Sequence, residues 1–289
     1  RCWHLGPGSR LAPAAQMRIH PGFLLAAEGP HGQLLNTGVA DWQALSLGGR
    51  QFTEPPAGWA GFLAGGFERI EGAADDFDPR GNTEGSASAE VGRAGRPGGI
   101  PYGHICVEHT LKPADLPPML SRPWSSQTVR AAGQLPDEAA AETQPVSADS
   151  PLTDRWQKAL ADDEPITVPP HTVQRVVIDL DDYVCAYVRA RISGGQGAFV
   201  RVHWAESLYD APMKDKGNRD EVDGKYFRGK GDEFMPSGPE HVFEPLWWRT
   251  GRYIQLLIRT ADATLTFEEL VLEETRYPAT FVDDLRCSD

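Results

Sequence analysis

The chain has 289 residues, of which 40% are hydrophobic, enough to bury a core in one large domain or two average ones. Its 30 glycines and 24 prolines exceed average usage and are typical of a β protein rich in turns. The formal net charge of −13 excludes the nucleic-acid-binding classes, because phosphate contacts need a basic face. This acidic balance fits ordinary solubility or a neutral ligand such as a carbohydrate.

No apolar run approaches the ~20 residues of a membrane-spanning helix. No charged and then apolar leader follows Arg1, so we expect a soluble protein without membrane contact, either cytoplasmic or exported. The four cysteines lie far apart and form no CxxC pair, which favours neither a zinc site nor a disulfide framework.

In chain order, residues 1–130 are irregular and predict a partial N-terminal β domain. Residues 131–160 are rich in Ala, Glu and Pro and predict a linker or a poorly ordered insertion. Within that segment, residues 151–160 predict a short helix capped by Thr153 or Asp154.

Residues 161–279 predict a β-sandwich domain, because apolar and polar residues alternate with a period of two in several windows. One face of the window 184–192 collects Val184, Ala186, Val188, Ala190 and Ile192. Residues 173–180, 198–204 and 253–260 repeat this pattern and are separated by turn signals. We therefore expect an all-β fold of antiparallel, jelly-roll-like sandwiches with little helix.

The acidic loop, residues 210–223, offers oxygen ligands of the kind that Ca²⁺ prefers, and its candidate ligands are Asp215, Asp220 and Asp223. The spacing does not match an EF-hand, and nearby basic residues neutralise much of the charge. The alternative is a salt-bridged loop that docks onto a neighbouring domain or edges a cleft. Its contact residues are then Asn218, Arg219, Asp220 and Glu221. No other cofactor is predicted.

Aromatic, arginine and carboxylate side chains suggest a carbohydrate site, because aromatic rings stack on sugars and charged groups bond hydroxyls. The candidate residues are Trp204, Glu206, Trp247, Trp248 and Arg249. Adjacent residues entering a strand point to opposite faces, so at least one of Trp247 and Trp248 is expected in the core. Arg249 or Arg252 is expected to bond a carboxylate such as Glu206. No GxSxG, HExxH or phosphate-loop motif occurs, and no carboxylate pair can be placed, so no catalytic residue is predicted.

Six segments in order resemble bacterial α-L-rhamnosidases of glycoside hydrolase family 78, in the β-sandwich region before their catalytic domain. They are ITVPPH (166–171), GGQGAFVRVHWAESL (194–208), GNRDEVDGK (217–225), GDEF (231–234), FEPLWWRTGRY (243–253) and TRYP (275–278). The resemblance covers about residues 160–289, and residues 30–125 match more loosely.

The resemblance implies an accessory role. In that family an (α/α)6 barrel carries the catalytic carboxylates, and the intact enzyme is an inverting α-L-rhamnosidase. We expect residues 280–289 to begin such a barrel, which would be this region's partner, and the region itself to be non-catalytic. Some members also bear a calcium-dependent rhamnose-binding module. The alternatives are therefore a carbohydrate-binding module and a purely structural sandwich.

Overall fold

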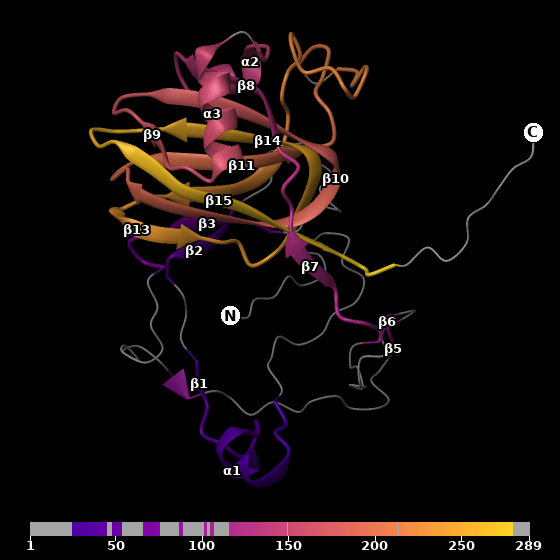
Figure 1. Cartoon of the computed structure of the whole chain (residues 1–289). Helices are drawn as coiled ribbons and strands as arrows, with labels where there is room; N and C mark the ends of the chain where they lie inside the picture. The colour runs from indigo at the N-terminus through magenta and orange to yellow at the C-terminus, as the bar shows by residue number, and fades with distance from the viewer. Residues whose placement is uncertain are drawn as a thin grey trace, which may run out of the picture. The chain divides into compact units, whose positions relative to one another are not determined.

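The computed structural model describes residues 25–44, 48–53, 66–75, 87–88, 101–102, 105–106, 116–148, 150–212 and 214–279. The chain forms two compact units (Figure 1). The first comprises Arg1–Pro113 with Asp232–Met235, and the second comprises Ala114–Gly231 with Pro236–Asp289. The expected barrel start at 280–289 lies outside the described residues. In the described part of the chain, no helix has both the length and the apolar character to span a membrane.

The first unit contains short elements, which are η1 (Gly29–His31), α1 (Gly32–Leu35), β1 (Gln43–Ala44), β2 (Arg50–Thr53), β3 (Phe67–Glu71), β4 (Ala87–Ser88), β5 (Pro101–Tyr102) and β6 (Ile105–Cys106). Antiparallel pairs form between β1 and β4, β2 and β3, and β5 and β6, while β3 runs parallel to β12 (Lys230–Met235). Arg50 fixes β2 through two hydrogen bonds to Asp75, of 2.6 and 2.8 Å, and one of 3.0 Å to Glu68. All three side chains are buried, so this charge is paired as burial requires.

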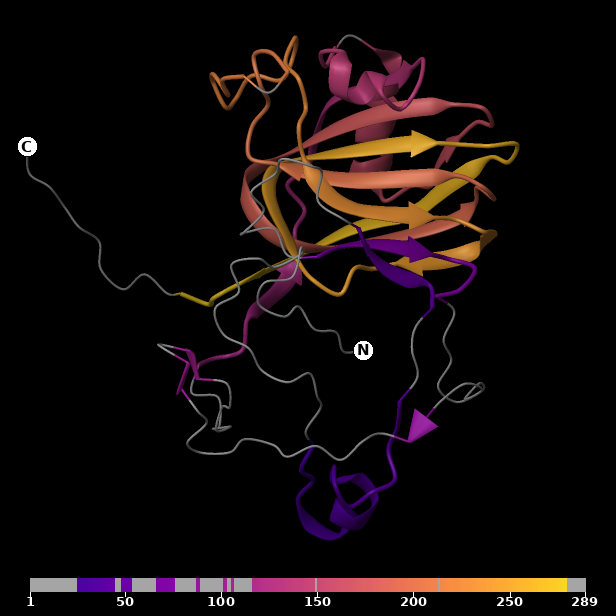
Figure 2. The same ribbon diagram turned by 180° about the vertical axis from the view of Figure 1, so that it is seen from behind.

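The second unit is an antiparallel sandwich with two helices, which confirms the predicted all-β class. Its strands are β7 (Leu120–Pro123), β8 (Thr128–Leu135), β9 (Ile166–Val168), β10 (Val173–Gly194), β11 (Phe199–Ala205), β13 (Gly238–Phe243), β14 (Arg249–Arg259) and β15 (Leu265–Arg276). Its helices are α2 (Ala140–Thr143) and α3 (Pro151–Asp162). Figure 2 shows these strands from behind, with the orange acidic loop at one end of them.

Strand β10 belongs to both layers of the sandwich. Residues 173–179 pair with β8 and β14, and β14 pairs in turn with β11; these four strands belong to the first layer. Residues 190–194 lie between β13 and β15, and β15 also pairs with β9 and β7; these strands form the second layer. The register shifts between Asp179 and Val184, and Asp181 there adopts a left-handed backbone with φ of 64°.

The core between the layers comes from the predicted alternation. The even-numbered apolar residues of β10 from Val184 to Ile192 are buried in the second layer. In the first layer, Val176, Leu256 and Val202 are paired across three strands and all are buried.

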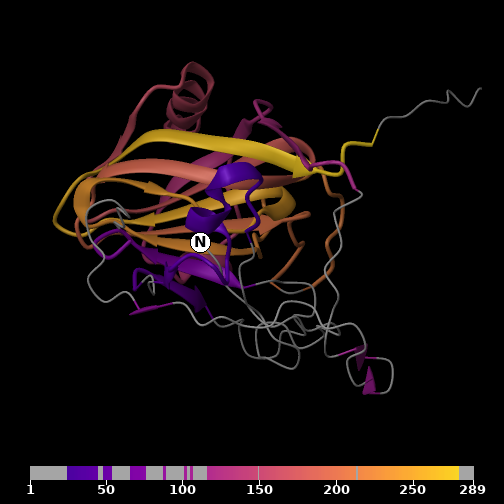
Figure 3. The same cartoon turned by 90° about the horizontal axis from the view of Figure 1, so that it is seen from below.

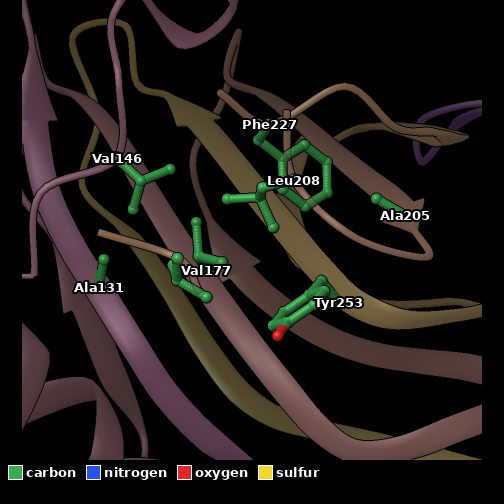
Figure 4. Close-up of a cluster of buried hydrophobic side chains, with 8 residues drawn as sticks. Ala131, Val146, Val177, Ala205, Leu208, Phe227 and Tyr253 are labelled. Carbon is green, nitrogen blue, oxygen red and sulfur yellow. The ribbon is translucent and has the colours of Figure 1, made fainter. Parts of the chain in front are cut away.

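The first layer is buried on its other face as well, contrary to the single apolar face that alternation predicts for 173–180. Figure 4 shows a cluster there in which Val177 and Tyr253 from the sheet meet covering residues from other segments. The cluster consists of Ala131, Val146, Val177, Ala205, Leu208, Val222, Phe227 and Tyr253. Strands covered on both faces lose the polar half of their pattern.

The N-cap of helix α3 is Ser150, three residues before the first predicted cap, Thr153. The Ser150 hydroxyl accepts a hydrogen bond of 3.2 Å from the Leu152 amide, and Pro151 occupies the first turn. Thr153 instead accepts from the Ala132 amide of β8 at 3.0 Å. Buried Trp156 meets Phe267 of β15 edge-on, and Arg155 donates to the Thr167 carbonyl of β9, so the helix lies beside β8 and β9 (Figure 3). Residues 131–160, expected as a linker or insertion, thus contain the end of β8 and both helices.

Candidate functional site at the loop end of the sandwich

The acidic loop is anchored on the first layer through the buried carboxylate of Asp179. Arg252 donates to its two oxygens at 2.9 and 3.2 Å, and Arg130 donates to one of them at 2.8 Å. The same two arginines reach the loop, because Arg252 pairs with the Asp220 carboxylate and Arg130 donates to the Asp220 carbonyl at 3.1 Å. The hydrogen bond to Asp179 is the main reason that the pKa of Arg252 is raised.

A third anchor comes from the neighbouring residue of β14. The hydroxyl of buried Tyr253 donates to the Arg219 carbonyl at 2.7 Å. Arg219 and Asp220 therefore hold the backbone of the loop to its own sheet, while the side chains of Asn218, Arg219 and Glu221 remain exposed.

Ion pairs also cross the loop from within. Lys225 bonds Asp210 and lies 2.8 Å from Glu221. The hydrogen bond to Asp210 is the largest cause of the raised pKa of Lys225, and Lys225 in turn lowers the pKa of Glu221. The side chain of Asn218 accepts from the Asp220 amide at 3.0 Å, which closes a local turn.

The candidate calcium ligands are not brought together. Asp220 is engaged by Arg252, and Asp223 accepts a 3.0 Å hydrogen bond from the Ala148 amide. Across the described ranges, no group of three or more His, Cys, Asp or Glu side chains is placed to hold a metal ion. Asp215 contributes a backbone carbonyl to the loop, accepting from the Asp210 amide at 2.9 Å.

Glu206, directly after β11, lies in an exposed patch of charged and phenolic groups. Its carboxylate accepts from Lys216 at 3.1 Å and from the Tyr183 hydroxyl, and Arg219 is 3.9 Å away. Lys216 also lies 5.6 Å from the centre of the Tyr209 ring. We call these five residues, Tyr183, Glu206, Tyr209, Lys216 and Arg219, the Glu206 patch.

Electrostatics keep Glu206 ionised. The hydrogen bond from Lys216, followed by that from Tyr183, lowers the pKa of Glu206. Partial burial, followed by the bond to Glu206, raises the pKa of Tyr183 to about 12. A general acid in glycoside hydrolysis needs a raised pKa, so Glu206 is suited to accept hydrogen bonds from hydroxyl groups and not to protonate a leaving group.

The predicted tryptophans occupy different environments. Trp204 is only 4% exposed and lies in the core between the layers, so its ring is closed to a ligand. Trp247 is 46% exposed and stacks on Trp248 with ring centres 5.9 Å apart and an interplanar angle of 27°. The expectation that these two point to opposite faces is wrong, because both precede the first residue of β14.

The tryptophan pair, Trp247 and Trp248, is separate from the Glu206 patch. In the ladder of β10 and β14, Arg249 pairs with Ala186 and Gly251 pairs with Val184. Trp248 and Tyr183 lie just beyond these pairs, about four strand positions or ~13 Å apart. Arg249 is buried, and Arg252 bonds carboxylates as expected, although these belong to Asp179 and Asp220 and not to Glu206.

Sequence reasoning found Glu206 and the loop residues but missed Tyr183 and Tyr209. The available signal was Tyr183, a large aromatic residue directly after Asp181 and Asp182 inside an apolar alternation. Such a break in the pattern marks the corner of β10, where the strand changes partners.

Comparisons with solved structures find distant similarities to other β-sandwich proteins. No protein-family model matches the chain, and no curated protein matches it. A family 78 rhamnosidase of Bacillus sp. GL1 is similar over 43% of this chain and 12% of its own, with 16% identity and a TM-score of 0.32. A Klebsiella oxytoca rhamnosidase with bound rhamnose is similar over 55% of this chain and 30% of its own, with 10% identity and a TM-score of 0.34.

A lectin is similar too. The fucolectin from striped bass (Morone saxatilis) serum shares 15% identity over 53% of this chain and 46% of its own, with a TM-score of 0.24. The chain spans less than a third of either rhamnosidase. At these identities and TM-scores the comparisons assign neither a family nor a function to the chain.

Proposed function

We propose that this chain is the non-catalytic accessory β region of an α-L-rhamnosidase-like glycoside hydrolase, and that its acidic loop braces a catalytic barrel. One observation carries the proposal. Three of the segments that carry the resemblance meet at one end of the sandwich. Arg252 and Tyr253 of one hold Arg219 and Asp220 of the next, and Glu206 of a third accepts from Lys216 beside them.

The physical support is preorganisation. The loop is held from beneath by a buried, fully paired carboxylate, while Asn218, Arg219 and Glu221 face outward. A partner that docks on a loop already held in place does not have to supply the entropy of ordering it.

Enzymatic assay is the first test. The purified chain should not hydrolyse an aryl α-L-rhamnoside above the buffer rate. The reading frame beyond Asp289 should encode a long helical segment with acidic motifs, as the (α/α)6 barrel requires. Turnover that survives repurification of the chain would overturn the accessory role.

Docking is tested by titrating the chain with the barrel encoded by that reading frame. The double variant Arg219→Ala/Glu221→Ala should weaken the complex at least about tenfold, since it removes the outward charges and leaves the anchors. Lys158→Ala on α3 is the matched control and should bind normally, because Lys158 pairs with Glu164 on another face. Unchanged binding of the double variant would remove the loop from the interface.

A second function, carbohydrate binding, is favoured by the exposed Trp247 ring stacked on Trp248. Titration with L-rhamnose should then give a saturable heat that Trp247→Ala abolishes, since a stacked aromatic face supplies most of such an affinity. A heat that disappears with chelator would indicate that binding needs a divalent cation such as calcium. Absence of any heat leaves the accessory role and rejects this function.

A further inference from the structure

Basic side chains gather on the covered face of the first layer, away from the Glu206 patch. Arg175 of β10 and Arg201 of β11 both pair with Leu257 of the strand between them, so they lie on the same face in one row. Arg228 and Lys230 follow the acidic loop and reach the same place. We call Arg175, Arg201, Arg228 and Lys230 the basic cluster. It stands out in a chain whose net charge is −13.

A carboxylate already lies at this cluster. Glu142 of α2 accepts from Arg228 at 2.5 Å with one oxygen and from Arg201 at 3.4 Å with the other. The Glu142 side chain is 45% exposed, whereas those of Arg201 and Arg228 are 15% and 23% exposed. The two guanidinium groups are therefore more buried than the Glu142 carboxylate that they share, and this carboxylate lies on the solvent side of the cluster.

The cluster retains unsatisfied capacity for an anion. Arg175 donates to the carbonyl oxygens of Gln144 and Pro145 at 3.0 and 2.6 Å, and these carry no formal charge. The Nε atom of Arg228 is buried and has no hydrogen-bond acceptor among the described residues. A buried donor left without an acceptor is unfavourable, and a ligand oxygen would satisfy it.

The potential at the cluster is positive. Burial lowers the pKa of Lys230, and Arg201 and Arg228 lower it further against the opposite effect of Glu142. His203, two residues from Arg201 on the same face of β11, has its pKa held well below the usual value by burial, then by Arg201 and Lys230. These shifts agree with the geometry, since each reports that a further positive charge is unfavourable there.

We propose that the basic cluster is a binding site for the carboxylate of an acidic sugar, and that Glu142 occupies it as an internal competitor. Glu142 itself shows that a carboxylate fits between Arg201 and Arg228, and guanidinium forks suit that group. The α2 segment that carries Glu142 has only four residues, so its carboxylate can yield to a ligand with little loss of structure. This inference does not depend on the proposed function.

The variant Glu142→Gln tests the competition. Sodium D-glucuronate, titrated at constant ionic strength, should bind this variant at least about tenfold more tightly than the unmodified chain, because the resident charge is gone. Neutral D-glucose should give no saturable heat. Acetate should bind more weakly than glucuronate, and equal affinity would overturn the assignment to a sugar. No saturable glucuronate heat with Glu142→Gln would overturn the site.

A second measurement guards against misfolding of the variants. Glucuronate should raise the melting temperature of Glu142→Gln but not that of Glu142→Gln/Arg228→Met, in which the exposed end of the cluster is lost. Arg189→Met in the Glu142→Gln background is the matched control, because Arg189 is also ion-paired, to Glu269 at 3.3 Å, on the other layer. If glucuronate raised the melting temperature of all three variants equally, the rise would be a general effect of added salt, and the proposal would be overturned.

Discussion

The two layers of the sandwich have opposite exteriors. The outward side of the first layer is covered by residues 136–146 and by the acidic loop, and it buries Val177, Tyr253 and Arg175. The outward side of the second layer meets solvent with a ladder of ion pairs between Arg189, Arg191, Glu240 and Glu269. Both candidate binding regions on the first layer depend on its cover, because the cover supplies Asp220, Glu142 and their neighbours.

The largest expected effect of this difference comes from Phe227, which is buried in the cluster on the covered face of the first layer. Phe227→Ala should lower the free energy of unfolding by about 3 to 5 kcal/mol, because it leaves a cavity where a ring was packed. Val242→Ala on the second layer, 43% exposed, should cost under about 1 kcal/mol. Chemical denaturation measures both. Similar losses would mean that the two exteriors do not differ as described.

Asp179→Asn should have the next largest effect. It removes the charge that Arg130 and Arg252 share, and hydrogen bonds to charged groups contribute about 1.5 to 3 kcal/mol. Limited proteolysis should then cut the acidic loop sooner, because its anchor is weakened. Asp181→Asn is the control, since this exposed carboxylate pairs with Ser126 and Asn tolerates its left-handed backbone. Unchanged loop protection in Asp179→Asn would contradict the anchoring role.

His203, on the covered face of the first layer, should make the free energy of unfolding depend on pH. Its pKa is lower in the folded chain than the ~6.5 of the unfolded chain, so the unfolded state binds more protons in acid. The contribution of neutral His203 to the free energy of unfolding is therefore fully present above about pH 6.5. It is lost as the pH falls below that value, by up to ~1.4 kcal/mol per pH unit. His203→Gln should flatten that slope in denaturation curves between about pH 6.5 and 5.

The control for this pH dependence is His171→Asn, because His171 is 73% exposed and has a left-handed backbone that Asn accepts. Its slope should match that of the unmodified chain. If the free energy of unfolding depends on pH equally in both variants, a group other than His203 is responsible.

The smallest effect is expected on the open face. Arg189→Ala should change the free energy of unfolding by under about 1 kcal/mol, since exposed ion pairs such as that with Glu269 contribute little. Added salt should narrow even this difference. A loss above about 2 kcal/mol would show that the second layer's exterior is not simply solvated.

The sequence predicted the strands best where only one face is buried. The alternation of 184–192 follows the observed burial of β10 in the second layer, residue by residue. It was less informative for 173–180, because Arg175, Val177 and Asp179 are buried too, beneath segments that lie far away in the sequence. Residues 131–160 carried no such pattern, since their buried Ala131, Ala140 and Ala141 are small and do not signal a core.

The site was partly predictable for a related reason. Glu206 and the charged loop stand out by residue type, but the partners of Asp220 are fixed only by the pairing of β8, β10 and β14. The position of Arg201 beside Arg228 and Glu142 likewise requires three segments to meet, and no local spacing encodes that. Trp204 looked like a ligand platform by type, yet its place in the strand directs it inward.

The sharing of β10 between both layers has a consequence for synthesis. Its partners flank it in the chain, with β8 made earlier and both β14 and β15 made later. Until Arg276 has left the ribosome, β10 can pair with β8 but lacks its complete partners β14 and β15, so its apolar residues are incompletely covered. A translational pause between residues 194 and 249 would therefore be the moment of greatest dependence on a chaperone.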